Sequence, residues 1–119
     1  MYLPNKYTRW YTDIIQKASI RTELFEYSER HHIIPKSLGG SDKKDNLVRL
    51  TAREHFICHW LLVKMVEGTN LLKMQKALWR MLVKGADYQL RYRPNSRTYE
   101  SLRLKYGKLR KGVITPDDV

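Results

Sequence analysis

Residues 29–60, with the sequence ERHHIIPKSLGGSDKKDNLVRLTAREHFICHW, carry the pattern from which we predict the fold. The segment 31–34 ends in two β-branched residues and suits a short strand, which Pro35 closes because proline cannot donate to a strand ladder. The two glycines at 39–40 supply the backbone freedom that a loop needs. A second apolar run at 47–50 is the next strand candidate. Two short strands joined by a loop predict a small hairpin.

A helix is expected directly after the second strand. Thr51 and Glu54 have the spacing of a capping box, in which the threonine hydroxyl and the glutamate carboxylate each accept from the other residue's backbone amide. The pattern predicts a helix from Ala52 to about Val66, with Gly68 as its C-terminal stop.

The flanks of this unit are also expected to be helical. Apolar residues recur at helical spacing over 7–18 and again over 70–83, and a last, very basic helix is expected over 97–110. This order of elements predicts an α+β fold, a mainly helical domain around a central hairpin. We expect one domain over 1–112, with its core motif at 29–66, a basic helical C-terminal part at 84–112 and a flexible tail at 113–119.

The composition narrows the class of protein. Lys and Arg number 23 against 12 Asp and Glu, so the formal net charge is +11 and polyanions are the expected partners. Cys58 is the only cysteine, which excludes an internal disulfide and a four-cysteine zinc site. No run approaches the roughly 18 apolar residues that span a bilayer, and no apolar signal segment is present. We therefore expect a cytoplasmic protein that is not secreted.

All four histidines lie between positions 31 and 59. His55 and His59 are four residues apart on the predicted helix, so their imidazoles leave the same face and can share one divalent ion. His31 and His32 are neighbours on the predicted strand and point to opposite faces. One of them can bind the metal while the other faces a substrate as a general base. Each pair of histidines taken alone is more often structural than metal-binding. The hypothesis of a metal site therefore depends on the two pairs occurring together.

The stretch from Glu29 to Gly40, the segment from Asn46 to Leu50, and His55 and His59 together resemble the HNH nuclease motif. The double histidine and the final His-x-x-x-His are most similar to the bacteriocin DNases of the colicin type. The surrounding residues are more similar to small bacteriophage HNH endonucleases, including homing endonucleases. The resemblance implies a ββα-metal site at the centre of the domain.

The resemblance also implies a role for each motif residue. His31, His55 and His59 would hold one divalent cation, and His32 would be the general base that activates water. Asn46 would hold the hairpin loop in shape and so orient His32. Many members have an acidic residue in place of His31, and an imidazole there makes Zn²⁺, Ni²⁺ or Mn²⁺ better suited than Mg²⁺. The metal could be any of these four.

Glu29 shares a strand face with His31. It is either a partner of the metal ligands or a solvated carboxylate.

Basic residues gather in two places that could contact DNA. The segment 84–112 carries nine Lys or Arg and interleaved tyrosines, and the central loop carries three lysines. A solvated helical face is the alternative for the first group. The candidate DNA-binding residues are Lys36, Lys43, Lys44, Arg91, Arg93, Arg97, Arg103, Lys105 and Lys108.

The resemblance to the HNH family, together with the positive charge, implies a metal-dependent endonuclease that hydrolyses DNA phosphodiester bonds and is encoded by a phage. Double-stranded DNA is the expected substrate, and cutting both strands would require a homodimer or two successive nicks, because one motif supplies one active site. A DNA-binding module with a structural zinc is the first alternative. It would need a fourth protein ligand and would leave His32 and Asn46 without a role. The second alternative is a bacteriocin-type DNase domain with an acidic inhibitor.

Overall fold

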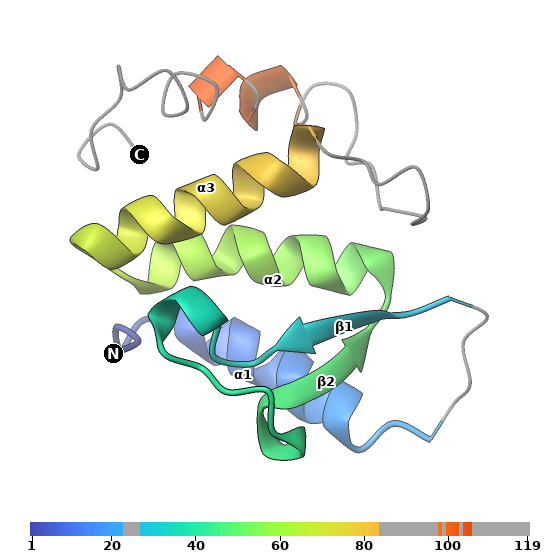
Figure 1. Cartoon of the computed structure of the whole chain (residues 1–119). Coiled ribbons are helices and arrows are strands. Elements are labelled where there is room, and N and C mark those ends of the chain that lie inside the picture. The colour runs from blue at the N-terminus through green and yellow to red at the C-terminus, as the bar shows by residue number, and fades with distance from the viewer. Residues whose placement is uncertain (23–26, 84–97, 99, 103, 106–119) are drawn as a thin grey trace.

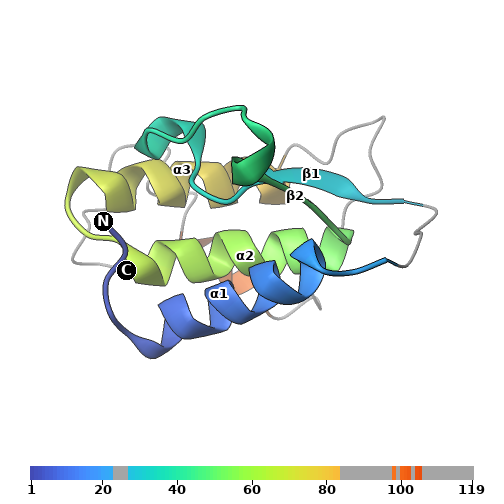
Figure 2. The same cartoon turned by 90° about the horizontal axis from the view of Figure 1, so that it is seen from below.

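A computed structural model describes residues 1–22, 27–83, 98, 100–102 and 104–105 of the chain. Helix α2 lies in the middle, with α3 on one side of it and the hairpin and α1 on the other (Figure 1), and α1 runs alongside α2 (Figure 2). The predicted mainly helical α+β fold, with the hairpin packed against the following helix, is confirmed. The elements are α1 (Lys6–Ser19), β1 (Glu29–His32), β2 (Leu47–Leu50), α2 (Ala52–Met65) and α3 (Thr69–Val83), with short 3₁₀ turns at Lys36–Leu38 and Lys44–Asn46.

Helix α1 begins after Asn5, whose side-chain oxygen accepts a hydrogen bond from the Thr8 amide at 3.0 Å. Such a cap satisfies a backbone donor that the first helical turn leaves without an intrahelical partner. The helix buries Tyr11, Ile15 and Ala18. The predicted helix over 7–18 is therefore confirmed, with one further residue at each end.

Helix α2 begins with the predicted capping box. The Thr51 hydroxyl accepts from the Glu54 amide at 3.1 Å, and a Glu54 carboxylate oxygen accepts from the Thr51 amide at 2.8 Å. These reciprocal bonds set the first turn of the helix that carries two of the four histidines.

The C-terminal end of α2 differs from the expectation. The helix ends at Met65, where the Leu3 amide donates to the Met65 carbonyl at 2.7 Å, and Val66 is already extended. The N-terminal segment thus satisfies a carbonyl that the helix end would leave without a partner. Gly68, with φ of +65°, lies beyond the helix and immediately precedes α3, so it does not cap α2.

The hairpin is antiparallel, and its first strand lies two residues earlier than the expected 31–34. Ile34 leaves the ladder because its amide donates to the side-chain oxygen of Asn46 at 2.8 Å instead of to a strand carbonyl. The shift leaves both His31 and His32 within the strand. The register pairs Glu29 with Leu50, Arg30 with Arg49, His31 with Val48 and His32 with Leu47.

The buried core forms where α2 meets its neighbours, and it fixes how the hairpin faces the helix. α2 contributes five fully or nearly fully buried side chains, and α1, β2 and α3 supply most of the others, together with Val66 and Leu102. The core residues of α2 are Phe56, Cys58, Leu62, Val63 and Met65.

The described positions within 98–105 are helical, in the span where the basic helix is predicted. The remainder of that prediction and the expected tail at 113–119 lie outside the described residues. In the described part of the chain, no helix has the length and apolar character needed to cross a membrane.

Candidate active site

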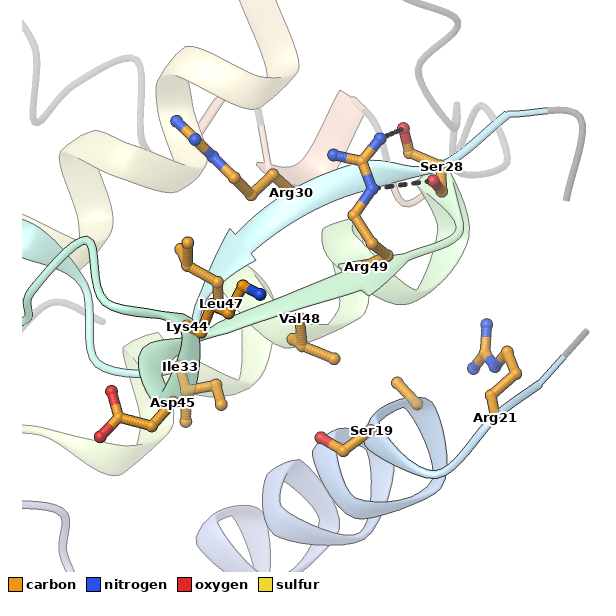
Figure 3. A pocket seen from close by; sticks show the side chains of 11 residues that line it. Ser19, Arg21, Ser28, Arg30, Ile33, Lys44, Asp45, Leu47, Val48 and Arg49 are labelled. Atoms are coloured by element: carbon orange, nitrogen blue, oxygen red, sulfur yellow. Dashed lines mark hydrogen bonds between the residues drawn. The ribbon is translucent and has the colours of Figure 1, made fainter. Parts of the chain in front are cut away.

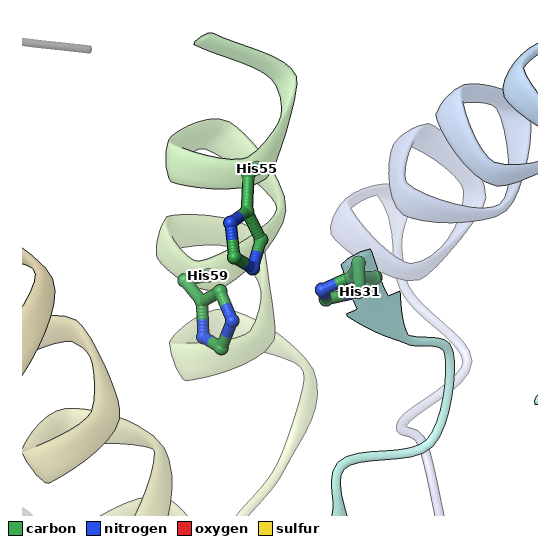
Figure 4. Close-up of side chains that lie close together, drawn as sticks. All are labelled: His31, His55 and His59. Atoms are coloured by element: carbon green, nitrogen blue, oxygen red, sulfur yellow. The ribbon is translucent and has the colours of Figure 1, made fainter. Parts of the chain in front are cut away.

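The side chains of His31, His55 and His59 converge between β1 and α2 (Figure 4). One potential ligand atom from each lies within 4.8 Å of the other two. The ring centroid of His31 lies 5.1 Å from that of His55 and 5.3 Å from that of His59, and the last two are 4.9 Å apart. The structure therefore brings together the three residues that the motif predicts as metal ligands.

The donor set of this cluster suits a transition-metal ion. Imidazole nitrogens are suitable ligands for zinc and nickel, whereas magnesium and manganese prefer oxygen ligands. Cys58 is fully buried and is not a member of the cluster.

Glu29 holds one of these imidazoles in orientation. Its side chain is 4% exposed, and one carboxylate oxygen accepts from Nδ1 of His55 at 2.6 Å. The hydroxyl of Tyr27 donates to the other oxygen. With its proton on Nδ1, His55 has its lone pair on Nε2, which is the state that a metal requires. The alternative of a solvated Glu29 carboxylate is wrong, because the side chain is buried and bonded to His55.

Tyr11 orients the second imidazole. Its hydroxyl lies 2.8 Å from Nε2 of His31 and donates to the Ile33 carbonyl at 2.6 Å. Since the single hydroxyl proton goes to that carbonyl, Nε2 of His31 is the donor to Tyr11 and Nδ1 carries the lone pair. Burial, followed by the nearby His55 and His32, lowers the pKa of His31 to about 3 and so keeps it neutral.

Asn46 ties the two ends of the hairpin loop together. Its side-chain oxygen accepts from the Ile34 amide at 2.8 Å, and its Nδ2 donates to the carbonyls of Ile34 at 3.0 Å and Ser41 at 2.8 Å. Asn46 is 8% exposed. A buried amide with three backbone partners holds a loop in one conformation, because each broken bond leaves a buried polar group unsatisfied.

His32 lies on the face of β1 opposite to His31, as the alternation of a strand requires. Its Nε2 lies 2.8 Å from Oδ1 of Asp42, whose other oxygen accepts from Nζ of Lys36 at 2.9 Å. The hydrogen bonds from His32 and Lys36 lower the pKa of the Asp42 carboxyl to about 2. The side chain of His32 is 20% exposed. One of its faces is therefore accessible from solvent.

A cavity of about 260 Å³ lies at the histidine cluster. Its lining includes all four histidines together with Lys36, one of the predicted DNA-binding residues. Arg30 and Arg80 also line it, and sequence reasoning had not singled out either residue.

A larger cavity, of about 900 Å³, lies between the end of α1 and the hairpin and contains none of the histidines (Figure 3). Lys44 lines this cavity, as do Arg30 and Arg49. Arg49 donates to the hydroxyl of Ser28 at 3.0 Å and to its carbonyl at 3.2 Å. The four histidines thus line the smaller cavity, whereas the larger cavity is lined partly by basic residues and by no histidine.

The remaining predicted DNA-binding residues fall into two groups. Lys43 is exposed in the loop, and Lys105 is half-buried. Five others lie outside the described residues, namely Arg91, Arg93, Arg97, Arg103 and Lys108.

Sequence reasoning missed Tyr11, Tyr27 and Asp42, which contact His31, Glu29 and His32 respectively. Tyr11 is 20 residues from its partner and carried only the signal of a core aromatic. Asp42 offered one usable signal, a carboxylate two residues after the loop glycines.

Comparisons with known proteins agree with this geometry. The HNH endonuclease family matches residues 17–59, which include the hairpin and the three clustered histidines. The chain is 38% identical over 112 residues to Probable mobile endonuclease E of Enterobacteria phage T4, an alignment that covers 94% of this chain and 77% of that protein. It is 41% identical over 113 residues to Probable mobile endonuclease D of the same phage, covering 91% of this chain and 43% of that protein.

Probable mobile endonuclease C of phage T4 is 41% identical over 78 residues, covering 63% of this chain and 35% of that protein. No solved structure matches the chain. The chain spans less than half of the length of endonucleases D and C and most of endonuclease E. The resemblance noted from the motif is confirmed: this chain belongs to the HNH endonuclease family, whose members are DNA-hydrolysing enzymes.

Proposed function

We propose that this chain hydrolyses DNA phosphodiester bonds with His32 as general base and with one divalent cation held by His31, His55 and His59. One observation carries this proposal. Three imidazoles converge within 4.8 Å on one side of β1, while the fourth lies on the other face of the same strand and borders the same cavity.

The cluster requires a cation that accepts nitrogen ligands. We infer Zn²⁺ or Ni²⁺ ahead of Mn²⁺ and Mg²⁺, because the three donors are all imidazoles. When bound, such an ion supplies positive charge that offsets the charge gained by the phosphodiester in the transition state. Glu29 accepts a hydrogen bond from Nδ1 of His55, and Tyr11 accepts one from Nε2 of His31, so each of these nitrogens keeps its proton. The other ring nitrogen of each histidine then has the lone pair that binds the ion.

His32 removes a proton from the attacking water in this proposal. A neutral imidazole has a ring nitrogen that can accept the proton, and histidine is the side chain most often used as a general base. The base has to be held in line with the phosphorus atom, and Asn46 contributes by fixing the loop that contacts His32.

The DNA backbone is proposed to contact the basic residues around the two cavities. Lys36, Lys43 and Lys44 in the loop would bind phosphates, together with Lys105 and the basic residues of 84–112. Arg30 and Arg49 lie directly opposite each other across the hairpin. Like charges in that position are unfavourable unless an anion lies between or beside them. Because these contacts join basic side chains to phosphates, the affinity for DNA should fall steeply as the salt concentration rises.

A zinc-stabilised binding module without catalytic activity is disfavoured by the same geometry. A structural zinc site usually has four protein ligands, and the cluster found among the described residues offers three. We further propose that residues 1–112 act as one domain, and that the protein nicks one strand per encounter unless it dimerises. As a phage-encoded mobile endonuclease, it would act in the host cytoplasm.

The test is a plasmid-nicking assay with the metal-free protein reconstituted separately with Mg²⁺, Mn²⁺, Ni²⁺ and Zn²⁺. Supercoiled, nicked and linear products are quantified, so the assay also separates nicking from double-strand cleavage. Calorimetric titration with each metal measures binding independently of activity.

Two variants separate the proposed roles. His32→Ala should bind metal normally and lose at least about 100-fold in cleavage rate, the contribution expected of a general base. His55→Ala should lose both metal binding and cleavage. A His32→Ala variant that cleaves at the parent rate would show that another group is the base, and metal binding unaffected by His55→Ala would place the ion elsewhere.

A further inference from the structure

A carboxylate lies beside the proposed base His32. The HNH motif assigns roles to histidine and asparagine residues and none to this carboxylate. Oδ1 of Asp42 is 2.8 Å from Nε2 of His32, within hydrogen-bond distance. The two residues are 10 positions apart and belong to different elements, since His32 ends β1 and Asp42 lies in the loop between the 3₁₀ turns.

We propose that Asp42 is a positioning residue for catalysis: its carboxylate accepts the Nε2 proton of His32 and thereby leaves the lone pair on Nδ1. This inference rests on the proposed function, because it assigns the nitrogen through which His32 acts.

The chemistry of the pair supports this direction of the hydrogen bond. An ionised carboxylate can only accept, so the imidazole nitrogen that faces it has to carry the proton. Asp42 is ionised at any pH at which an enzyme would work, because His32 and Lys36 lower its pKa to about 2. A neutral imidazole has one proton, so the Nδ1 nitrogen must be the acceptor.

The surrounding contacts hold the carboxylate in place. Nζ of Lys36 donates to Oδ2 at 2.9 Å, which leaves Oδ1 for His32. The preceding residue, Ser41, accepts from Nδ2 of Asn46 at 2.8 Å. Asn46 therefore acts on His32 through the loop that carries Asp42, which gives a physical route for the orienting role expected of this asparagine.

The effect of Asp42 should be smaller than that of His32 itself. The side chain of Asp42 is 60% exposed, and water can replace part of its hydrogen bond. We expect Asp42→Ala to lower kcat by about 10- to 100-fold, a part of the 10²–10⁴ expected of a positioned base. KM and metal affinity should stay within twofold of the parent values, because Asp42 contacts none of the clustered imidazoles in the described structure.

Asp45→Asn is the matched control. Asp45 is an exposed carboxylate in the 3₁₀ turn that follows this loop, and its side chain has no hydrogen bond or ion pair to the described residues. Its substitution removes one negative charge, as Asp42→Ala does, without touching His32. Cleavage by Asp45→Asn should equal that of the parent or rise slightly through tighter DNA binding.

The experiment combines cleavage kinetics with a spectroscopic measurement on the metal-free protein. Long-range proton–nitrogen NMR at alkaline pH distinguishes the two neutral tautomers of His32. The parent should show the Nε2-protonated form, and Asp42→Ala should show a mixture, together with the fall in kcat. Asp42→Asn, which retains a side-chain oxygen acceptor, should recover part of both.

Failure of this inference is distinguishable from failure of the proposed function. An unchanged His32 tautomer in Asp42→Ala, or an equal loss of rate in Asp45→Asn, would overturn the role of Asp42 even if His32→Ala is inactive. Normal cleavage by His32→Ala would overturn the assignment of the base, while the NMR measurement would still decide whether Asp42 sets its tautomer.

Discussion

Replacing Gly40 by alanine should misplace the catalytic loop while leaving the metal ligands intact. A Cβ atom at this position would lie 1.7 Å from the carbonyl oxygen of Ile34 and 2.9 Å from Nδ2 of Asn46. Real Cβ atoms essentially never approach a heavy atom within 3.0 Å, so the Gly40 and Ile34 backbones must separate by about 1.3 Å.

That displacement acts on the bonds that shape the loop. The Ile34 carbonyl that meets the new Cβ also accepts from Asn46. Leaving a buried amide unsatisfied costs about 1–3 kcal/mol, so we expect the free energy of unfolding to fall by roughly 2–4 kcal/mol when strain is included. A misplacement of about 1 Å at a reacting group can lower the rate about 100-fold, and we expect a loss of that size in cleavage.

Gly39→Ala provides the matched control. Gly39 has φ of +97°, so alanine there is strained, but nothing lies within 4 Å of the added Cβ. We expect a loss of about 1–2 kcal/mol in stability from the left-handed backbone, with cleavage close to that of the parent.

The assays are urea unfolding followed by tryptophan fluorescence, plasmid nicking, and calorimetric metal titration for both variants. Metal affinity should be the same in both, because neither glycine contacts the histidine cluster. Cleavage by Gly40→Ala within threefold of the parent would refute the reasoning, and so would an equal loss of activity in Gly39→Ala.

Three other variants or reagents test separate parts of the structure. Glu29→Gln should weaken metal binding about 10- to 100-fold in calorimetric titration, because a neutral amide accepts from Nδ1 of His55 more weakly than the carboxylate does and can also donate to it. Cleavage should recover at saturating metal, and unchanged affinity would argue against this role. Thr51→Ala should lower the free energy of unfolding by about 1 kcal/mol in urea, through loss of the α2 cap, and an unaltered midpoint would contradict it. Burial raises the pKa of the Cys58 thiol to about 12, above its ordinary value near 9, so at pH 8 Ellman's reagent should label the folded protein far more slowly than the unfolded one.

The features that local patterns predicted are those set by near neighbours in the chain. The capping box of α2 and the one-turn spacing of His55 and His59 depend on residues three or four positions apart. The first strand of the hairpin begins two residues before the predicted one, because its end is set by a residue far away in the sequence. Where β1 ends depends on the Asn46 side chain, which is 12 residues away from Ile34.

The amino-acid order alone predicted the α+β class and the helix that presents two of the clustered histidines, because helical periodicity and caps depend on residues a few positions apart. The HNH family was indicated separately, by the resemblance of the histidine and asparagine motif. The folded chain was needed to show that Glu29 is buried against His55, that Tyr11 orients His31 and that Asp42 contacts His32. These contacts join residues from different elements, and their existence depends on how α1, the hairpin loop and α2 pack together. No pattern of neighbouring residues encodes that packing directly.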